Sequence, residues 1–288
     1  MKYRFMEDQR SLYAVEEMAG ALGVSTSGYY GWRKRGKSQR ETAKEKMVFE
    51  IRQIHEKSRH IYGSPRIYAE LRRKGYRCNE KRIARLMREN GIRAKTKKRF
   101  KITTHSKHSY PISVNLVQRD FTAERPNKVW VTDITYIWTA EGWLYLVIYL
   151  DIYSRKIVGW ALKDNMSESL ILEGLNNAVM NRRPESGLII HSDRGSQYAG
   201  TDFRRTLGYY KFESSMSGAG NCYDNAVAEA FFHTLKTEWI YFKRYETREE
   251  AKRDIFEYIE VFYNRQRLHS TLGNLSPVEF ETVGHFSN

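Results

Sequence analysis

The chain has 288 residues and a formal net charge of +15, and this length allows two domains, one of them with a sizeable core. Its two cysteines, Cys78 and Cys222, lack partners at metal-ligand spacing, which argues against a zinc site and is typical of free thiols in a reducing compartment. Residues 1–8 lead into no apolar signal segment, and the longest apolar stretch, residues 143–152, is about half the length of a membrane span, so the sequence predicts a cytoplasmic protein with no membrane partner.

The positive charge is concentrated in the front of the chain. Residues 1–119 contain 30 Lys and Arg against 11 Asp and Glu, a net charge of +19. Residues 120–288 contain 19 against 23, a net charge of −4. This asymmetry predicts a polyanionic partner for the front half.

Residues 1–40 show a pattern typical of a small helix-turn-helix. Apolar residues recur at three- and four-residue spacing in the first predicted helix, namely Val15, Met18, Ala19 and Leu22. Gly23 can take a positive φ and Ser25 can cap a second helix over residues 26–33. An ordinary helical hairpin would give the same pattern, so both interpretations stay open.

Residues 41–91 predict a second helix-turn-helix module. Its first helix covers residues 43–57, and Ser64 as N-cap with Pro65 at the first position begins the next. Asn79 caps a third helix, which ends at Gly91. Three basic residues on this last helix would contact DNA phosphates: Arg82, Arg85 and Arg88.

Residues 92–124 form a predicted basic linker. From residue 93 to residue 101, six of nine side chains are basic and none is acidic. A disordered tether explains this composition, but its charge favours a segment that orders along DNA. Lys97, Lys98 and Arg99 are therefore candidate DNA contacts.

Residues 125–288 change to strand patterns. Three β-rich runs with links short enough for antiparallel hairpins come first, at residues 129–138, 143–152 and 156–162. Alternating helices and strands follow: a helix capped by Ser167, a strand at 188–192, a helix at about 200–207, a strand near 211–214 and a long helix from Asn225. The predicted order is βββαβαβα.

Three carboxylates stand where these patterns give them no routine structural role. Asp133 interrupts the apolar run over residues 129–137, Asp193 ends the run over 188–193, and Glu229 follows a Gly-rich loop, with 35 residues between Asp193 and Glu229. Carboxylates brought together repel one another unless cations join them. Such hard oxygen ligands suit Mg²⁺ or Mn²⁺, and a pair of these ions can drive in-line displacement at phosphorus. The three residues therefore predict chemistry on a phosphodiester.

The helix that carries Glu229 has two distinct faces. At 100° per residue, Asn225, His233 and Lys236 lie within about 40° of Glu229. An apolar stripe occupies the opposite side: Val227, Phe231, Leu235 and Trp239. A solvated Glu–Lys face explains the polar stripe, but it does not explain the other two carboxylates.

Four sequence motifs carry a family resemblance: WVTDITY at 130–136, HSDRGSQY at 191–198, DNAVAEAFF at 224–232 and YNRQRLHSTL at 263–272. In order and spacing they resemble the catalytic core of DDE transposases and retroviral integrases. The likeness is greatest to bacterial insertion-sequence transposases encoded by two overlapping reading frames, in which this chain is similar to the second-frame product. Together with the front half, it covers nearly the whole chain.

The resemblance implies an α/β fold, with a ribonuclease-H-like mixed-sheet catalytic core preceded by small all-α helix-turn-helix domains. It implies that Asp133, Asp193 and Glu229 bind two Mg²⁺ or Mn²⁺ ions and catalyse cleavage at transposon ends followed by strand transfer. It also implies that Lys236, seven positions after Glu229, contacts the DNA end.

The resemblance also sets the expected partners. They are double-stranded DNA, as the terminal inverted repeats and the target, and a second copy of the chain in a dimer or higher assembly. The first-frame product is a further expected partner, separate or as a frameshift fusion, because residues 1–119 lack a sustained leucine zipper.

The predicted roles of other polar residues near these motifs are less specific. His191 and His233 invite a general-base role, although a metal ion can activate the nucleophile by itself. Asp151 is predicted to be structural and Asp224 to cap a helix. Two residues of the last motif, Arg267 and His269, are predicted either to support the core or to contact DNA.

Two other functional classes stay open. A ribonuclease-H-like nuclease would cut DNA without joining it, and a decayed transposase would bind DNA as a non-catalytic repressor. The basic front half and Lys236 favour joining, and the presence of all three carboxylates favours catalysis. The formation of joined strands separates these classes.

Overall fold

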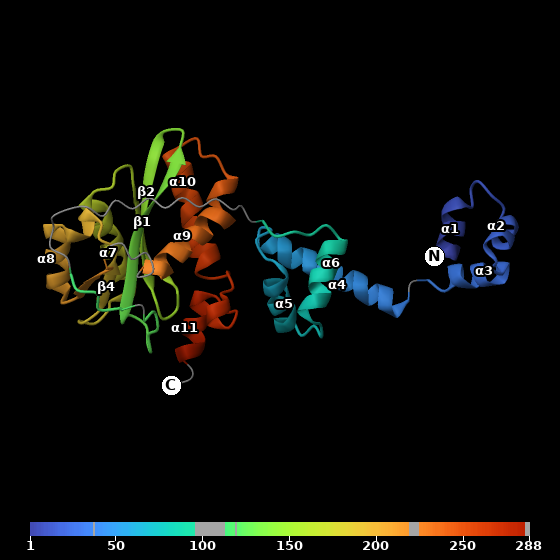
Figure 1. Ribbon diagram of the computed structural model, residues 1–288, viewed down its shortest axis with the longest axis horizontal. Coiled ribbons are helices and arrows are strands. Elements are labelled where there is room, and N and C mark those ends of the chain that lie inside the picture. The colour runs from blue at the N-terminus through green and yellow to red at the C-terminus, as the bar shows by residue number, and fades with distance from the viewer. Residues whose placement is uncertain (37, 96–112, 119, 219–224, 286–288) are drawn as a thin grey trace. The chain divides into compact units, whose positions relative to one another are not determined.

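The computed structural model describes residues 1–36, 38–95, 113–118, 120–218 and 225–285. The chain divides into two compact units, Met1–Arg93 and Ala94–Asn288. Figure 1 labels the elements of each unit along the chain. The front unit is all helical, and the second unit contains the only strands of the described residues.

The first three helices of the front unit enclose a small core of their own. They are α1 (Lys2–Gln9), α2 (Val15–Leu22) and α3 (Thr26–Lys34). Gly23 ends α2 at φ +61°, and the Ser25 hydroxyl accepts a hydrogen bond from the Gly28 N–H at 3.0 Å. Both features confirm the predicted turn. Helix α1 was not predicted, because Met6 is its only buried residue and one apolar position sets no period.

Three further helices follow in the same unit: α4 (Gln39–Lys57), α5 (Ser64–Arg73) and α6 (Glu80–Glu89). They contact one another through fully buried residues on each helix, including Ile51, Ile67, Leu71 and Ile83. The predicted cap Asn79 is confirmed, since its Oδ1 accepts from the Arg82 N–H at 2.8 Å. The prediction for Ser64 was wrong: Gly63 is the N-cap, and Ser64 is the first helical residue.

The second unit is built on a five-stranded mixed sheet in the order β3-β2-β1-β4-β5. Its strands are β1 (Val129–Thr139), β2 (Gly142–Asp151), β3 (Ile157–Lys163), β4 (Ile189–Ser192) and β5 (Glu213–Met216). The first three pair antiparallel, and β1, β4 and β5 pair parallel. With α7 (Glu168–Arg182), α8 (Thr201–Tyr210) and α9 (Ala226–Glu238), the chain order is the predicted βββαβαβα.

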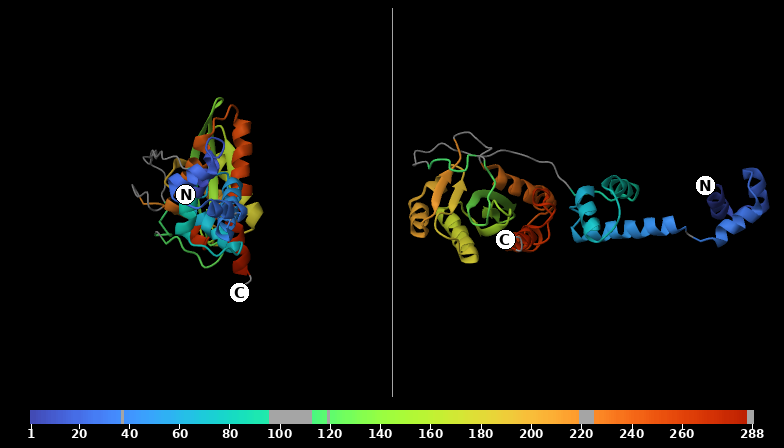
Figure 2. Two further views of the ribbon diagram at one scale, coloured as in Figure 1. Left: turned by 90° about the vertical axis from the view of Figure 1, so that its right-hand side faces the viewer. Right: turned by 90° about the horizontal axis from the view of Figure 1, so that it is seen from below.

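Helices cover both faces of this sheet. Figure 1 and Figure 2 show α7 and α8 on one side of the strands, with α9 and the C-terminal helices on the other. The α7–α8 side contains a core of buried residues that includes Trp130, Tyr149, Leu170 and Phe203. Close packing there requires Gly159, because a Cβ at this position would lie 2.4 Å from the Ala178 backbone nitrogen.

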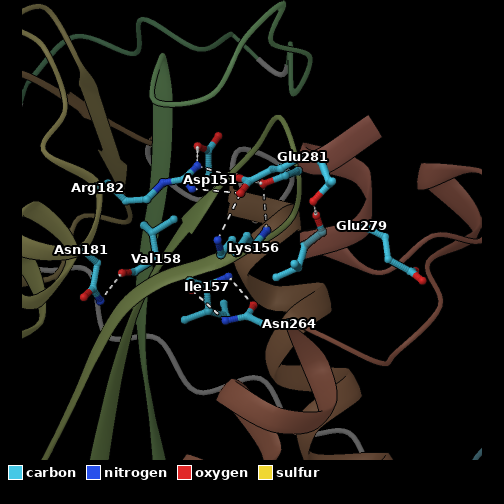
Figure 3. A network of polar contacts seen from close by, with 12 residues as sticks. Asp151, Lys156, Ile157, Val158, Asn181, Arg182, Asn264, Glu279 and Glu281 are labelled. Atoms are coloured by element: carbon cyan, nitrogen blue, oxygen red, sulfur yellow. Dashed lines mark hydrogen bonds and ion pairs between the residues drawn. The ribbon is translucent and has the colours of Figure 1, made fainter. Parts of the chain in front are cut away.

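The C-terminal segment closes the edge of the sheet at β3. It comprises α10 (Arg248–Phe256), a π-helix (Glu257–Tyr263), a 3₁₀ turn (Ser270–Leu272) and α11 (Pro277–His285). The Asn264 amide accepts from the Ile157 N–H and donates to the Ile157 carbonyl, both at 3.0 Å (Figure 3). An open edge strand exposes unpaired backbone N–H and carbonyl groups to other chains. The Asn264 side chain pairs with these groups of Ile157, as a neighbouring strand would.

A buried ionic network attaches α11 to the same side of the molecule. The Arg182 guanidinium contacts the Glu281 carboxylate at 2.6 Å and Asp151 at 3.1 Å (Figure 3). Asp151 also accepts from the Asn127 N–H at 2.8 Å. Burial raises the pKa of Asp151, and these donors oppose the rise. Asp151 therefore has the structural role that its place at a strand end predicted.

Candidate active site

Two of the three predicted carboxylates are brought together by the pairing of β1 with β4. These strands are parallel, and their last paired residues are Val131 and His191. Asp133 and Asp193 each lie two residues beyond that pair. Side chains two positions apart share a face, so the continued register sets both carboxyl groups side by side on one face of the sheet.

Backbone N–H groups hold both carboxyl groups in place. Asp133 Oδ1 accepts from the Ile134 N–H at 2.8 Å, and Asp193 Oδ1 accepts from the Gly195 N–H at 2.9 Å. A Cβ at Gly195 would lie 3.0 Å from Asp193 Oδ1, so a side chain there would crowd the carboxyl group. Each of the two carboxylates therefore has one fixed oxygen.

The third predicted carboxylate, Glu229, comes from α9, which contacts β1. Asn225 immediately precedes this helix and donates through Nδ2 to the Thr132 carbonyl at 3.4 Å. Thr132 adjoins Asp133, so this contact attaches the start of α9 beside the first carboxylate. The predicted apolar stripe on the opposite side of the helix is buried at Phe231 and Leu235.

The charge of Asp193 affects the protonation of both Asp133 and Glu229. Burial raises the pKa of Asp133, and the neighbouring charges of Asp193 and Glu229 raise it further. The Ile134 N–H and the Lys236 ammonium oppose this rise. Loss of solvation raises the pKa of Glu229, and the Asp193 charge adds to the effect. The structure therefore brings all three predicted residues into one electrostatic cluster.

The three carboxyl groups do not yet converge on one position that a metal ion could occupy. Within the described ranges, no three His, Cys, Asp or Glu side chains converge at metal-ligand distances. The donor set nevertheless fits a hard divalent cation, because it offers carboxylate oxygens, and burial together with neighbouring negative charge raises the pKa of Asp133 and of Glu229. A cation between them would remove the repulsion that now favours their protonated forms.

Lys236 lies at the border of the cluster. Its Nζ stands 4.7 Å from the centroid of the Tyr136 ring. Burial lowers the pKa of Lys236, and the Asp133 charge opposes that decrease. Lys236 lies two turns after Glu229 on the same helix, and this spacing brings its ammonium group near Asp133.

A hydrogen-bonded group around His191 was not foreseen from the sequence. His191 is fully buried, with Nδ1 at 2.8 Å from Ser215 Oγ and Nε2 at 3.4 Å from Ser217 Oγ. Arg194 Nε donates to the Ser217 carbonyl at 2.7 Å. These contacts fix the residues on either side of Asp193. Serines in a short strand give no pattern that would have shown them as partners.

His233 is exposed on α9, and its backbone carbonyl accepts from the Thr237 hydroxyl at 2.8 Å. The predicted cap Asp224 and the second cysteine, Cys222, lie outside the described residues.

Arg267 and His269 lie in the C-terminal segment, where Arg267 is buried. Its guanidinium donates to both Glu238 carboxylate oxygens, each at 2.8 Å. Burial alone would lower the pKa of Arg267, but the paired carboxylate raises it overall. His269 packs edge-on against the Tyr263 ring, with centroids 4.9 Å apart.

The candidate DNA contacts of the front unit differ in how far they are described. Arg85 and Arg88 are exposed on α6, and Arg82 is half-buried on the same helix. Arg85 lies 3.8 Å from Glu89 in an exposed ion pair. The three linker candidates, Lys97, Lys98 and Arg99, lie outside the described residues.

The fold and site together define a class of protein. A mixed sheet in the order β3-β2-β1-β4-β5, with acidic residues on β1, after β4 and on α9, is a ribonuclease-H-like core. Family models agree: an integrase core domain matches residues 123–222, and a second integrase core model matches residues 229–283. An HTH-like domain matches residues 41–100.

Relatives with similar sequences extend along almost the whole chain. An uncharacterized 31 kDa protein of insertion element IS600 from Shigella sonnei is 44% identical over 268 residues, covering 93% of this chain and 98% of the relative. Transposase InsF of insertion sequence IS3A from Escherichia coli K12 is 39% identical over 283 residues, covering 98% of both. The chain therefore belongs to the IS3-type family of insertion-sequence transposases, and it is a transposase.

Solved structures with a related arrangement are more distant. One is a simian T-cell lymphotropic virus intasome in complex with a PP2A regulatory subunit, with a TM-score of 0.47 and 14% identity over 80% of this chain and 74% of that chain. Another is the HTLV-2 integrase catalytic core domain in complex with magnesium, with a TM-score of 0.43 and 12% identity over 55% of this chain and 98% of that chain. No helix among the described residues is long and apolar enough to cross a membrane.

Proposed function

We propose that Asp133, Asp193 and Glu229 form the active site of this transposase and that it requires two Mg²⁺ or Mn²⁺ ions. The observation that carries the proposal is the proximity of the three carboxyl groups where β1, the end of β4 and α9 meet: the charges of Asp193 and Glu229 raise the pKa of Asp133, and the charge of Asp193 raises the pKa of Glu229. When bound there, the two ions would activate the attacking oxygen and stabilise the leaving 3′-oxygen.

The protein's own groups would orient these carboxylates and neutralise the DNA. The Ile134 and Gly195 N–H groups each fix one carboxylate oxygen, and these contacts would orient Asp133 and Asp193 for binding a cation. The Lys236 ammonium, held near Asp133, would contact a phosphate beside the scissile bond.

The proposed reaction has two displacements at phosphorus. Water first attacks the phosphodiester at the element end, and the bond to the 3′-oxygen breaks to leave a free 3′-hydroxyl. That hydroxyl then attacks a second phosphodiester, losing its proton as the new bond forms and the former 3′-oxygen leaves. No covalent bond between protein and DNA is required.

DNA binding would be shared between the two units. We propose that Arg82, Arg85 and Arg88 contact phosphates from α6, with Lys97, Lys98 and Arg99 as further contacts in the basic linker. For Arg267 and His269 we favour the supporting role of the two that the sequence left open, because the Arg267 charge is buried and paired with Glu238.

The proposed organisation follows the same reasoning. Residues 1–40 and 41–91 would be two helix-turn-helix modules, residues 92–124 a basic linker, and residues 125–288 the catalytic core with its C-terminal helices. Because two element ends must be brought together, we propose a dimer or higher assembly on the terminal inverted repeats and target DNA. The first-frame product, separate or fused, and a cytoplasmic location beside the bacterial nucleoid complete the proposal.

A cleavage and joining assay tests this function. Labelled duplexes bearing both ends of the encoding element would be incubated with Mg²⁺ or Mn²⁺ and with the wild type, Glu229→Gln or the control Glu249→Gln, which alters an exposed carboxylate on α10. We expect nicked and joined products from the wild type and the control, and a loss of at least about 1,000-fold in Glu229→Gln.

Each other outcome has a defined meaning. Equal activity of Glu229→Gln and the wild type would reject the active site. Nicking without joined strands would support the nuclease class, and binding without cleavage would support the repressor class once the fused first-frame product had also failed to restore activity.

A further inference from the structure

The β1–β2 hairpin extends beyond the rest of the sheet. Strand β4 pairs with β1 only at residues 129–131, and β3 pairs with β2 only from Tyr145 onward. Residues 137–139 of β1 and 142–144 of β2 therefore pair only with each other among the five strands, and Tyr136 pairs with Tyr145 at their base. We call these two segments the hairpin arm.

The two faces of the hairpin arm differ in burial. On one face Ile137 and Leu144, which are paired with each other, are fully buried, and α10 contacts β1. The other face carries the cross-strand pair Trp138–Trp143, with Tyr136 two positions earlier on β1. These three rings remain 59%, 43% and 38% exposed, respectively.

The exposed rings form one continuous row. The Trp138 and Trp143 ring centroids lie 4.8 Å apart, and those of Trp143 and Tyr136 lie 5.0 Å apart, both edge-to-face. Isolated apolar residues on a surface need no explanation, but two tryptophans and a tyrosine in mutual contact mark an interaction site. We call them the aromatic row.

Lys236 links the aromatic row to the candidate active site. Tyr136 lies three residues after Asp133 on β1, about 10 Å along the strand and on its opposite face. The Lys236 Nζ, whose pKa the Asp133 charge raises against the effect of burial, lies 4.7 Å from the Tyr136 ring centroid. A cation thus lies beside the row, on the same helix as Glu229.

We propose that the aromatic row binds unpaired or frayed bases of the DNA end by stacking while Lys236 contacts the adjoining phosphate. This inference rests on the proposed function, because the active site determines which nucleotides lie beside the row. An aromatic ring can stack on any base, so the contact would be tolerant of sequence. It would also favour ends whose terminal pairs have opened.

Two features of the row select this ligand over its competitors. Bases inside a duplex are already stacked on their neighbours, so only unpaired or terminal bases offer a free face to a ring. An apolar protein partner would be served equally well by aliphatic side chains and would have no use for the adjacent ammonium. Lys236 gives the row the charge that a nucleic acid requires.

The test compares DNA tails with and without bases. The full chain would be titrated, in EDTA and by fluorescence anisotropy, with duplexes that end in a short thymine tail or in an abasic tail with the same phosphates. We expect the wild type to prefer the thymine tail by about 5-fold to 150-fold, the range given by stacking of one base. A 2-aminopurine in the tail should lose fluorescence on binding.

Matched variants then locate the effect. Trp138→Leu and Trp143→Leu keep an apolar side chain but remove the ring, and we expect both to abolish the preference, while Trp143→Phe should retain most of it. The control is Tyr209→Leu, which removes a ring that is 80% exposed on α8 and should leave the preference intact. Thermal unfolding would verify that the variants fold.

The inference is overturned if the wild type binds both tails equally without quenching of 2-aminopurine, or if the leucine variants keep the preference. A change in sedimentation of the leucine variants with the preference unaltered would instead assign the row to a contact between copies. Because binding in EDTA does not require metal chemistry, it can fail while Glu229→Gln still abolishes cleavage, so the two proposals fail separately.

Discussion

The two units of this transposase use charge in opposite ways. In the front unit charge is exposed: the Lys44–Glu89 pair, at 2.8 Å, has side chains that are 50% and 43% exposed. In the catalytic unit the Arg267–Glu238 pair has the same 2.8 Å separation, but its side chains are 6% and 12% exposed. The front charge is available to a polyanion, whereas the buried charge is committed to holding the scaffold of the site.

This difference predicts how each unit responds to substitution. An exposed pair loses little when one partner is neutralised, because water solvates the remaining charge. A buried pair leaves an uncompensated charge in a poorly solvated place. Equal separations should therefore give very unequal losses of stability.

The largest loss should follow from breaking the buried pair. Glu238→Gln leaves the Arg267 guanidinium buried without its carboxylate, and we expect a decrease of about 3–5 kcal/mol in the free energy of unfolding. Glu89→Gln in the front unit should lower it by no more than about 1 kcal/mol. Denaturant unfolding, followed by tryptophan fluorescence for the catalytic unit and by far-ultraviolet circular dichroism for the helical front unit, measures both. Similar losses would refute the contrast.

A smaller loss should follow from removing the amide at the sheet edge. Asn264→Leu leaves the buried N–H and carbonyl of Ile157 without partners, which should cost about 2–4 kcal/mol. The front-unit counterpart is Asn79→Ala, which removes one helix cap at an exposed position and should cost about 1 kcal/mol. The same unfolding measurements apply, and a loss for Asn264→Leu below that for Asn79→Ala would contradict the proposed edge contact.

A gain of stability is expected at the active site itself. A carboxyl group whose pKa is raised on folding binds more protons in the native state than in the unfolded state, so stability falls as pH rises from the unfolded pKa through the raised pKa. Asp133→Asn removes that penalty. In EDTA at neutral pH we expect the melting temperature to rise by about 2–4 °C, as about 1 kcal/mol would produce in a domain of this size.

The pH dependence provides the check on this explanation. The advantage of Asp133→Asn over the metal-free wild type should shrink as the pH is lowered through the raised pKa of Asp133, since the wild-type carboxyl group then becomes neutral. A difference that stays constant with pH would show that packing, and not charge repulsion, causes the gain.

What the sequence predicted well depends on local signals. Asn79 and Gly23 marked helix ends because caps act within one turn, and β1 and α9 appeared within a residue or two of their predicted starts. The proximity of Asp133 and Asp193 is a matter of strand register, which the residues alone do not give, and it entered as an implication of the family resemblance.

What the sequence missed depends on partners far along the chain. Asn264 lies 107 residues from Ile157, and Arg267 lies 29 residues from Glu238. In a polar sequence motif, an asparagine or arginine gives the same sequence pattern whether it contacts DNA, water or a buried backbone group. The burial of Arg267 could therefore be learned only from the folded chain.

The smallest expected effect concerns single cations of the front unit, and it tests whether their charge serves DNA. Arg85→Gln and Arg88→Gln alter exposed side chains on α6, so each should leave the fold intact while lowering the slope of log affinity against log salt by about 0.9, the contribution of one phosphate contact. The matched control is Arg205→Gln on α8, a 76% exposed side chain in the catalytic unit. If all three variants changed the slope equally, net charge alone would govern binding. If only the α6 variants did so, the front unit would be the part that holds the DNA backbone.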